Sequence, residues 1–224
     1  MLHSVQTGET AFDSIHGMGL FDYLRQSPEA TEIFHANMTA MTVQEAQAVV
    51  AAYDFSNTRV LVDVGGGHRA LANAILRAHP QLHALVFDQP SVIEGTRIRL
   101  ESAGVLDRCA VRGGSFFDSV PAGGDTYTLK DILHDWDDDA SLAILRNCRR
   151  SMSSSARLLV IERVIPVGND PMIGKLIDIG MLVLTGGQER TEAEYRALLE
   201  AAGFRQSAIV AAGEGTSVVE TIPV

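Results

Sequence analysis

A histidine followed by an acidic run stands where an apolar strand is expected to end. Residues 129–138 read LKDILHDWDD, and the run from Asp125 to Lys130 predicts a short strand that delivers His134 to the edge of a sheet. Open parallel sheets bind ligands at the carboxyl ends of their strands. His134 is therefore a candidate general base, because imidazole exchanges protons near neutral pH. A histidine that only caps or packs locally is the alternative.

A glycine-rich turn and a second carboxylate point to a ligand at the same edge. Residues Asp63 to Gly67 read DVGGG and stand between a predicted strand and a predicted helix, where glycines let a ligand approach the backbone. Asp88 ends the next predicted strand, in a position to accept hydrogen bonds from ribose hydroxyls. The pattern predicts a nucleoside-containing cofactor. The dinucleotide fingerprint fits poorly, since its third glycine would fall at Ala70, and a tight turn without a ligand remains the alternative.

Short β-branched runs alternate with helical patterns behind a helical front, which predicts an α/β protein with a mostly parallel sheet. Strands are predicted at 59–64, 84–88, 109–112, 126–129 and 158–162, and helices within 10–53 and at 70–79, 140–152, 172–184 and 195–202. Two closing runs, 207–212 and 217–222, predict a terminal antiparallel hairpin. We expect two segments, a helical one over residues 1–55 and the α/β body over residues 56–224.

Composition limits the class of protein. The 224 residues are 46% hydrophobic, which is enough for one sizeable core. A net charge of −10 without a basic run argues against a nucleic-acid partner, and no apolar run approaches the ~20 residues of a membrane span. Cys109 and Cys148 are too few for a disulfide framework or a zinc site, so we expect buried thiols in a reducing compartment, the cytoplasm.

Taken together, the motifs resemble one family. They are 11–13 (AFD) with Gly17, 63–67 (DVGGG), 87–90 (FDQP), 113–117 (GGSFF), 129–138 and 186–191 (GGQERT). The chain resembles the catalytic domain of the S-adenosylmethionine-dependent, metal-independent small-molecule O-methyltransferases, which include plant caffeic acid and bacterial polyketide-tailoring enzymes. The resemblance implies a Rossmann-like, seven-stranded, mostly parallel sheet with an antiparallel last strand, preceded by linker helices that help to form the substrate pocket.

The resemblance also implies catalytic roles. His134 matches the base that takes a proton from a hydroxyl, phenolic in the leading interpretation, of a small natural-product-like substrate. Glu162 and Glu189 match two acids that flank and orient this histidine. With an ordinary pKa near ~6.5, His134 is expected to be mostly neutral at cytoplasmic pH, as a base must be.

Binding roles follow in the same way. The residues matched to S-adenosylmethionine are Gly65, Gly67, Asp88, Gln89, Ser115, Phe116 and Lys130, and those matched to the substrate are Met181 and Asp178. Met181 could equally be a plain core residue. Arg69 stands where the family usually has a glycine, and Ser115 replaces an aspartate that faces the adenine, so weakened cofactor binding is predicted.

Other interpretations stay open. Asp135 and the aspartates at 137–139 could bind magnesium, although the acidic first turn of a helix is the favoured interpretation and no metal is expected. The fold could serve non-methylating chemistry: hydroxylation, decarboxylation or a pericyclic reaction. The family normally begins with an N-terminal dimerisation domain that this sequence does not contain. We therefore expect a fragment, a split enzyme with a separate N-terminal dimerisation subunit, or a shortened protein, with a homodimer also open.

Overall fold

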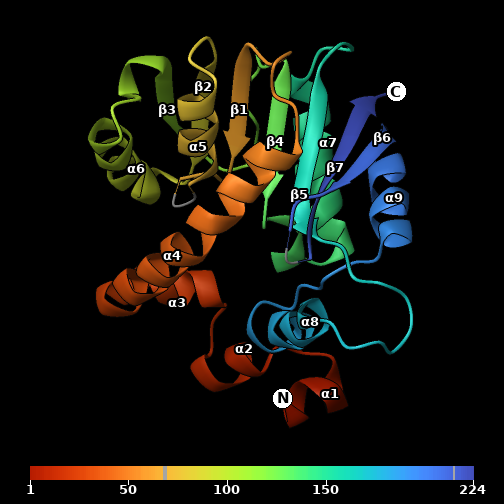
Figure 1. Ribbon diagram of the computed structural model, residues 1–224. Helices are drawn as coiled ribbons and strands as arrows, with labels where there is room; N and C mark the ends of the chain where they lie inside the picture. The colour runs from red at the N-terminus through yellow and green to blue at the C-terminus, as the bar shows by residue number, and fades with distance from the viewer. Residues whose placement is uncertain (68–69, 214) are drawn as a thin grey trace.

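One seven-stranded sheet forms the centre of the computed structural model, which describes residues 1–67, 70–213 and 215–224, with backbone alone at 35 and 37–41 (Figure 1). The strands are β1 (Val60–Val64), β2 (His83–Asp88), β3 (Cys109–Gly113), β4 (Thr126–Lys130), β5 (Arg157–Arg163), β6 (Phe204–Ala211) and β7 (Thr216–Pro223). Their order is β3-β2-β1-β4-β5-β7-β6. Strands β1 to β5 are parallel, and β7 is antiparallel to both neighbours. The predicted fold class and the terminal hairpin are confirmed.

Helices cover both faces of the sheet and its carboxyl edge (Figure 1). They are α1 (Leu2–Thr7), α2 (Ala11–His16), α3 (Leu20–Gln26), α4 (Pro28–Ala52), α5 (Leu71–Ala78), α6 (Pro90–Ser102), α7 (Asp138–Ser151), α8 (Ile173–Leu184) and α9 (Glu192–Ala201), with 3₁₀ turns η1 (Leu106–Arg108) and η2 (Leu133–Asp135). Helices α1, α2 and α8 lie beyond the carboxyl ends of the parallel strands (Figure 1). In the part of the chain that the structure describes, no helix has the length and apolar character needed to cross a membrane.

Each face of the sheet has its own core because successive side chains of a strand point to opposite faces. In β5, Leu158 and Val160 pack with α7 and α9, whereas Leu159 and Ile161 pack with α4 and α5. This double burial explains why β5 is a continuous apolar run. The two cysteines lie one in each core, and burial raises the pKa of both thiols to about 12, so they are buried thiols as expected.

We expect Leu159→Ala to lower the free energy of unfolding by about 2 to 5 kcal/mol, because it leaves a cavity in a core where this side chain is fully buried. Val167→Ala is the control, since Val167 is 85% exposed, and it should stay within about 0.5 kcal/mol of wild type. Chemical denaturation measures both. Equal effects of the two substitutions would contradict the assignment of this core.

A candidate active site at the carboxyl edge of the sheet

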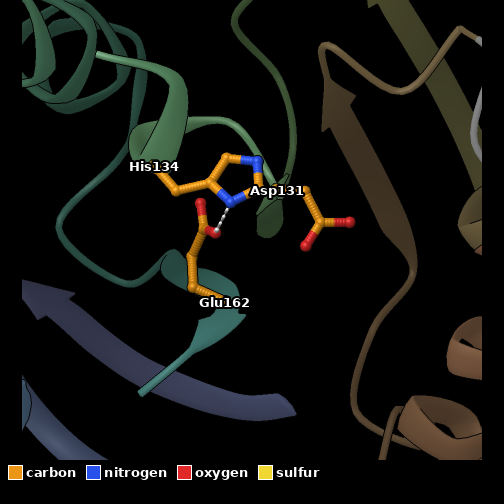
Figure 2. Close-up of side chains that lie close together, drawn as sticks. All are labelled: Asp131, His134 and Glu162. Atoms are coloured by element: carbon orange, nitrogen blue, oxygen red, sulfur yellow. Dashed lines mark ion pairs between the residues drawn. The ribbon is translucent and has the colours of Figure 1, made fainter. Parts of the chain in front are cut away.

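His134 lies in η2, between β4 and α7, and its side chain is 10% exposed. Its Nδ1 is 3.0 Å from Glu189 Oε1 and 3.8 Å from Glu162 Oε2. Figure 2 shows the imidazole with Glu162, at the end of β5, close to its Nδ1 edge and Asp131 nearby. The structure thus brings together the three residues predicted to be catalytic, from three separate segments of the chain.

Glu162 also holds the backbone of the turn that carries His134. Its Oε1 accepts hydrogen bonds from the backbone N–H groups of Ile132 (2.9 Å) and Leu133 (2.8 Å). Its Oε2 has no hydrogen-bond partner among the described residues, and the side chain is fully buried. A buried, incompletely bonded carboxylate is costly unless a positive charge lies nearby, and the His134 ring is the group that can supply it.

The pKa of His134 differs from the sequence expectation. Burial alone lowers this pKa, but the carboxylates of Glu162 and Asp135, the hydrogen bond to Glu189 and the charge of Asp131 together raise it to about 10. These surroundings favour a protonated imidazole at neutral pH, whereas the ordinary histidine pKa had led us to expect a mostly neutral one. Glu162 responds in turn: burial raises its pKa to about 7 although the charge of His134 opposes that shift.

Arg190 is a residue that the motifs did not single out for a role. Its side chain is 1% exposed, and its guanidinium donates to the carbonyl oxygens of Leu133 and Trp136, both at 2.9 Å. It also donates to Asp138 Oδ1 at 2.8 Å. These bonds hold both ends of the turn that contains His134. The feature of the sequence that could have indicated a role for Arg190 is its position directly after Glu189.

The glycine-rich turn fits a cofactor that approaches the backbone. Gly65 has φ +73°, and a Cβ there would lie 2.4 Å from Ile132 Cδ1. At Gly67 a Cβ would lie 2.4 Å from Val92 and 2.9 Å from Asp88 Oδ2, which accepts the Gly67 N–H at 2.9 Å. The left-handed φ favours glycine at position 65, and a side chain at position 67 would have to displace Val92 and Asp88, so the close approach of strand end, turn and Asp88 relies on these two glycines.

A cavity of about 400 Å³ opens in front of this turn, within the usual size range of small-molecule sites. Gly65, Asp88, Gln89 and Phe116, four of the predicted cofactor residues, line it. The opposite wall comes from α3 and α4. A second cavity of about 470 Å³ shares part of this wall and adds Ser115.

Aromatic side chains dominate the shared wall. Phe21, Phe116 and Trp136 line both cavities, and the Phe21 ring is stacked on Trp136 with centroids 5.8 Å apart. Such a wall favours a planar aromatic group. Phe21, from the helical front of the chain, thus contributes directly to this aromatic wall.

The remaining predicted residues have other positions. Met181 lies on α8 and does not line either cavity within the described residues, and Asp178 Oδ1 accepts the backbone N–H of Glu189 at 2.8 Å. Lys130 is buried in ion pairs with Glu45 (2.6 Å) and Asp131. Their binding roles stay predictions. Arg69 lies outside the described residues.

The acidic run behaves as the first turn of a helix. Asp137 caps α7 by accepting the Ala140 N–H at 2.8 Å, and Asp138 follows in the first turn. A different trio, Asp131, His134 and Glu162, places one potential metal-binding atom from each residue within 4.8 Å of the others (Figure 2). Each of these side chains already has partners within the protein, which argues against a bound metal ion. Metal independence is a proposal.

The fold and the glycine-rich turn define a Rossmann-like protein whose site fits a nucleoside-containing cofactor, and comparison with known proteins identifies the family. The chain belongs to the O-methyltransferase domain family, whose sequence profile matches residues 1–205. It is 47% identical to phenazine O-methyltransferase PhzM of Lysobacter antibioticus, over 100% of this chain and 66% of that protein. The chain therefore spans slightly less than two thirds of this curated relative.

Solved structures agree with this assignment. The mitomycin 7-O-methyltransferase MmcR superposes with a TM-score of 0.96 at 39% identity, covering 100% of this chain and 66% of the other. An O-methyltransferase from neocarzinostatin biosynthesis (NcsB1), solved with S-adenosylmethionine and 2-hydroxy-5-methyl naphthoic acid, gives 0.91 at 34% identity with the same coverage. The family uses S-adenosylmethionine, as the sequence resemblance implied.

We expect Arg190→Met to lower the free energy of unfolding by about 3 kcal/mol, because it removes a buried, charged donor from two carbonyl oxygens and from Asp138. Among the described residues, the carbonyl oxygens of Leu133 and Trp136 then keep only the longer bonds from Ser141 Oγ and, for Leu133, from the Trp136 N–H. Arg196→Met is the matched control, since Arg196 forms an exposed pair with Glu192, and it should cost less than about 1 kcal/mol. Thermal or urea unfolding distinguishes the two. A loss at Arg190 no larger than at Arg196 would show that the turn does not depend on this guanidinium.

Proposed function

We propose that this chain transfers the methyl group of S-adenosylmethionine to a hydroxyl group of a small, aromatic, natural-product-like molecule, with His134 as general base and without a metal ion. The observation that carries the proposal is the His134–Glu189 pair beside the aromatic cavity at the carboxyl edge of the sheet. The names of its relatives support it, because they are methyltransferases that act on small molecules.

Cofactor binding is assigned to the turn and its surroundings. When bound, S-adenosylmethionine supplies an activated methyl group on a sulfonium. The backbone at Gly65 and Gly67 would admit its methionine part, Asp88 and Gln89 would hold the ribose, and Phe116 would pack on the adenine, with Ser115 at the edge of that site. Lys130, buried in ion pairs with Glu45 and Asp131, is assigned as a further cofactor contact.

The proton is handled by His134. A carboxylate at 3.0 Å from Nδ1 accepts a hydrogen bond from it and so favours the tautomer with its proton there. Nε2 is then the atom that receives the substrate proton. Asp178 stabilises this arrangement, since it holds the backbone of Glu189 and thereby the position of the orienting carboxylate.

The raised pKa of His134 supports a phenolic acceptor. A phenol has an ordinary pKa near ~10, as tyrosine does, and the pKa of His134 is raised to about 10. Transfer of the proton between groups of matched pKa is close to energetically neutral. An aliphatic alcohol is a far weaker acid, so the same base would serve it less well.

The helical front and its partner are also part of the proposal. Residues 1–55 would form one wall of the substrate pocket against residues 56–224, since Phe21, Leu24 and Phe34 line the first cavity. Large apolar side chains are exposed on α1 and α8, namely Leu2, Val5, Ile173 and Leu176. We propose that an N-terminal dimerisation subunit, or a second copy of this chain, covers them.

His134→Ala should lower kcat by about 10²- to 10⁴-fold while binding of S-adenosylhomocysteine is kept, because the substitution removes the base and spares the turn. His83→Ala, at the exposed start of β2, is the control and should behave as wild type. Methylated product is measured by mass, and cofactor binding by calorimetry. Product of unchanged mass would refute methyl transfer, and loss of activity on chelation of metals would refute the metal-free mechanism.

The pH profile tests the charge on the base. The raised pKa of His134 keeps the imidazole protonated at neutral pH, so kcat/KM of the wild type should rise with pH toward about 10. Glu162→Gln removes a negative charge and keeps an acceptor for the two backbone N–H groups, so this rise should move to lower pH. A wild-type profile centred near ~6.5, the ordinary histidine pKa, would contradict the assigned environment.

A further inference from the structure

Four charged side chains form a buried cluster beside residues 132–136, the turn that carries His134 (the catalytic turn). Of the four, only the lysine was predicted to have a role. The buried charge cluster comprises Glu45, Lys130, Asp131 and Arg163, whose side chains are 1% to 18% exposed. Glu45 Oε2 is 2.6 Å from Lys130 Nζ, and its Oε1 pairs with Arg163. Both cations also pair with Asp131, in the case of Arg163 at 3.4 Å. In these ion pairs, two negative and two positive side chains therefore compensate one another away from water.

The cluster is joined to the catalytic turn through Asp131. Asp131 has φ +47°, a left-handed conformation that few residues other than glycine adopt without a stabilising environment. Its backbone N–H donates to the Ile161 carbonyl at 3.0 Å, and the next two N–H groups donate to Glu162. Ion pairs on the Asp131 side chain thus hold the residue at which the chain bends toward His134.

The cluster is also joined to the helix that forms the cavity wall. Glu45 lies on α4 next to Ala46, which is fully buried against the sheet together with Val49. Toward the start of the same helix, Thr31 and Phe34 line the first cavity. The carboxylate of Glu45 is therefore a charged contact from the cavity-forming helix to the ends of β4 and β5, which flank the turn that carries His134.

We propose that Glu45 is a positioning residue for methyl transfer: by bridging Lys130 and Arg163 it holds Asp131, and through it the turn that carries His134 beside the cavity. This inference rests on the proposed function. It differs from a purely structural role in its consequence, since loss of Glu45 changes both the position of the catalytic turn and the charge around the imidazole.

The test uses Glu45→Gln, which keeps the shape of the side chain and removes its charge, with Glu32→Gln on the exposed face of α4 as the control. Glu45→Gln should lower kcat by about 10- to 100-fold with a smaller change in the dissociation constant of S-adenosylhomocysteine. Glu32→Gln should leave kcat unchanged. Matched circular dichroism and melting curves show whether each variant is folded at the assay temperature.

The pKa of His134, read from imidazole NMR shifts, supplies a second readout that needs no turnover. Among the described residues, the charged groups that act on this ring include Glu162, Glu189, Asp135 and Asp131. Without Glu45 the cluster carries a net positive charge, so the pKa of His134 should fall. The double variant Glu45→Gln/Arg163→Gln restores neutrality, so this pKa should return toward wild type while kcat stays low.

The outcomes separate the positioning role of Glu45 from the proposed methyl-transfer function. Wild-type kcat and an unshifted pKa of His134 in folded Glu45→Gln would overturn the positioning role. If Glu45→Gln does not fold, the double variant, in which the charges balance, carries the same test, and wild-type kcat in it would overturn the role. Absence of methyl transfer in the wild-type chain would instead refute the proposed function, and the NMR shift would still decide whether Glu45 acts on His134.

Discussion

A buried carboxylate at the end of β5 is the constraint on which the rest of the site depends. Glu162 is fully buried, so its charge has to be compensated by the groups around it. Two backbone N–H groups bond one oxygen, and the His134 ring faces the other. That arrangement dictates the tight turn after β4. The buried charge cluster and Arg190 stabilise the same turn from its two sides, one through Asp131 and the other through the carbonyl oxygens.

Two glycines show how closely the catalytic segments approach one another. A Cβ at Gly187 would lie 2.0 Å from the His134 carbonyl oxygen, so the turn that carries Glu189 can reach the imidazole only with a glycine there. On the cofactor side, Gly65 has φ +73°, and a side chain there would have to displace the Ile132 side chain of the catalytic turn. The catalytic turn is thus packed between two backbone segments, which limits its freedom before any ligand binds.

The sequence predicted the sheet well because buried strands appear as short apolar runs. It indicated His134 by its place after a predicted strand, and Glu162 and Glu189 through the family resemblance. The structure brings the three side chains together, and their catalytic roles stay predictions. Helix α6 was missed, since few of its residues are buried and its apolar pattern is weak. Glu45 was missed for another reason. Its partner Lys130 is 85 residues away, and no local pattern marks a pair that only the fold creates. The sequence did not indicate the raised pKa of His134 for the same reason, because the charges that raise this pKa come from separate segments of the chain.

The two glutamates beside His134 divide two tasks that one carboxylate could not perform well. Glu189, bonded to Nδ1 at 3.0 Å, sets the orientation and tautomer of the ring. Glu162, at 3.8 Å and bonded elsewhere, acts mainly through its charge. The charge makes the imidazole a stronger base, and it also keeps more of the imidazole protonated at neutral pH. In the proposed mechanism, the site would give up some neutral imidazole in exchange for a base strong enough to take a proton from a weakly acidic hydroxyl.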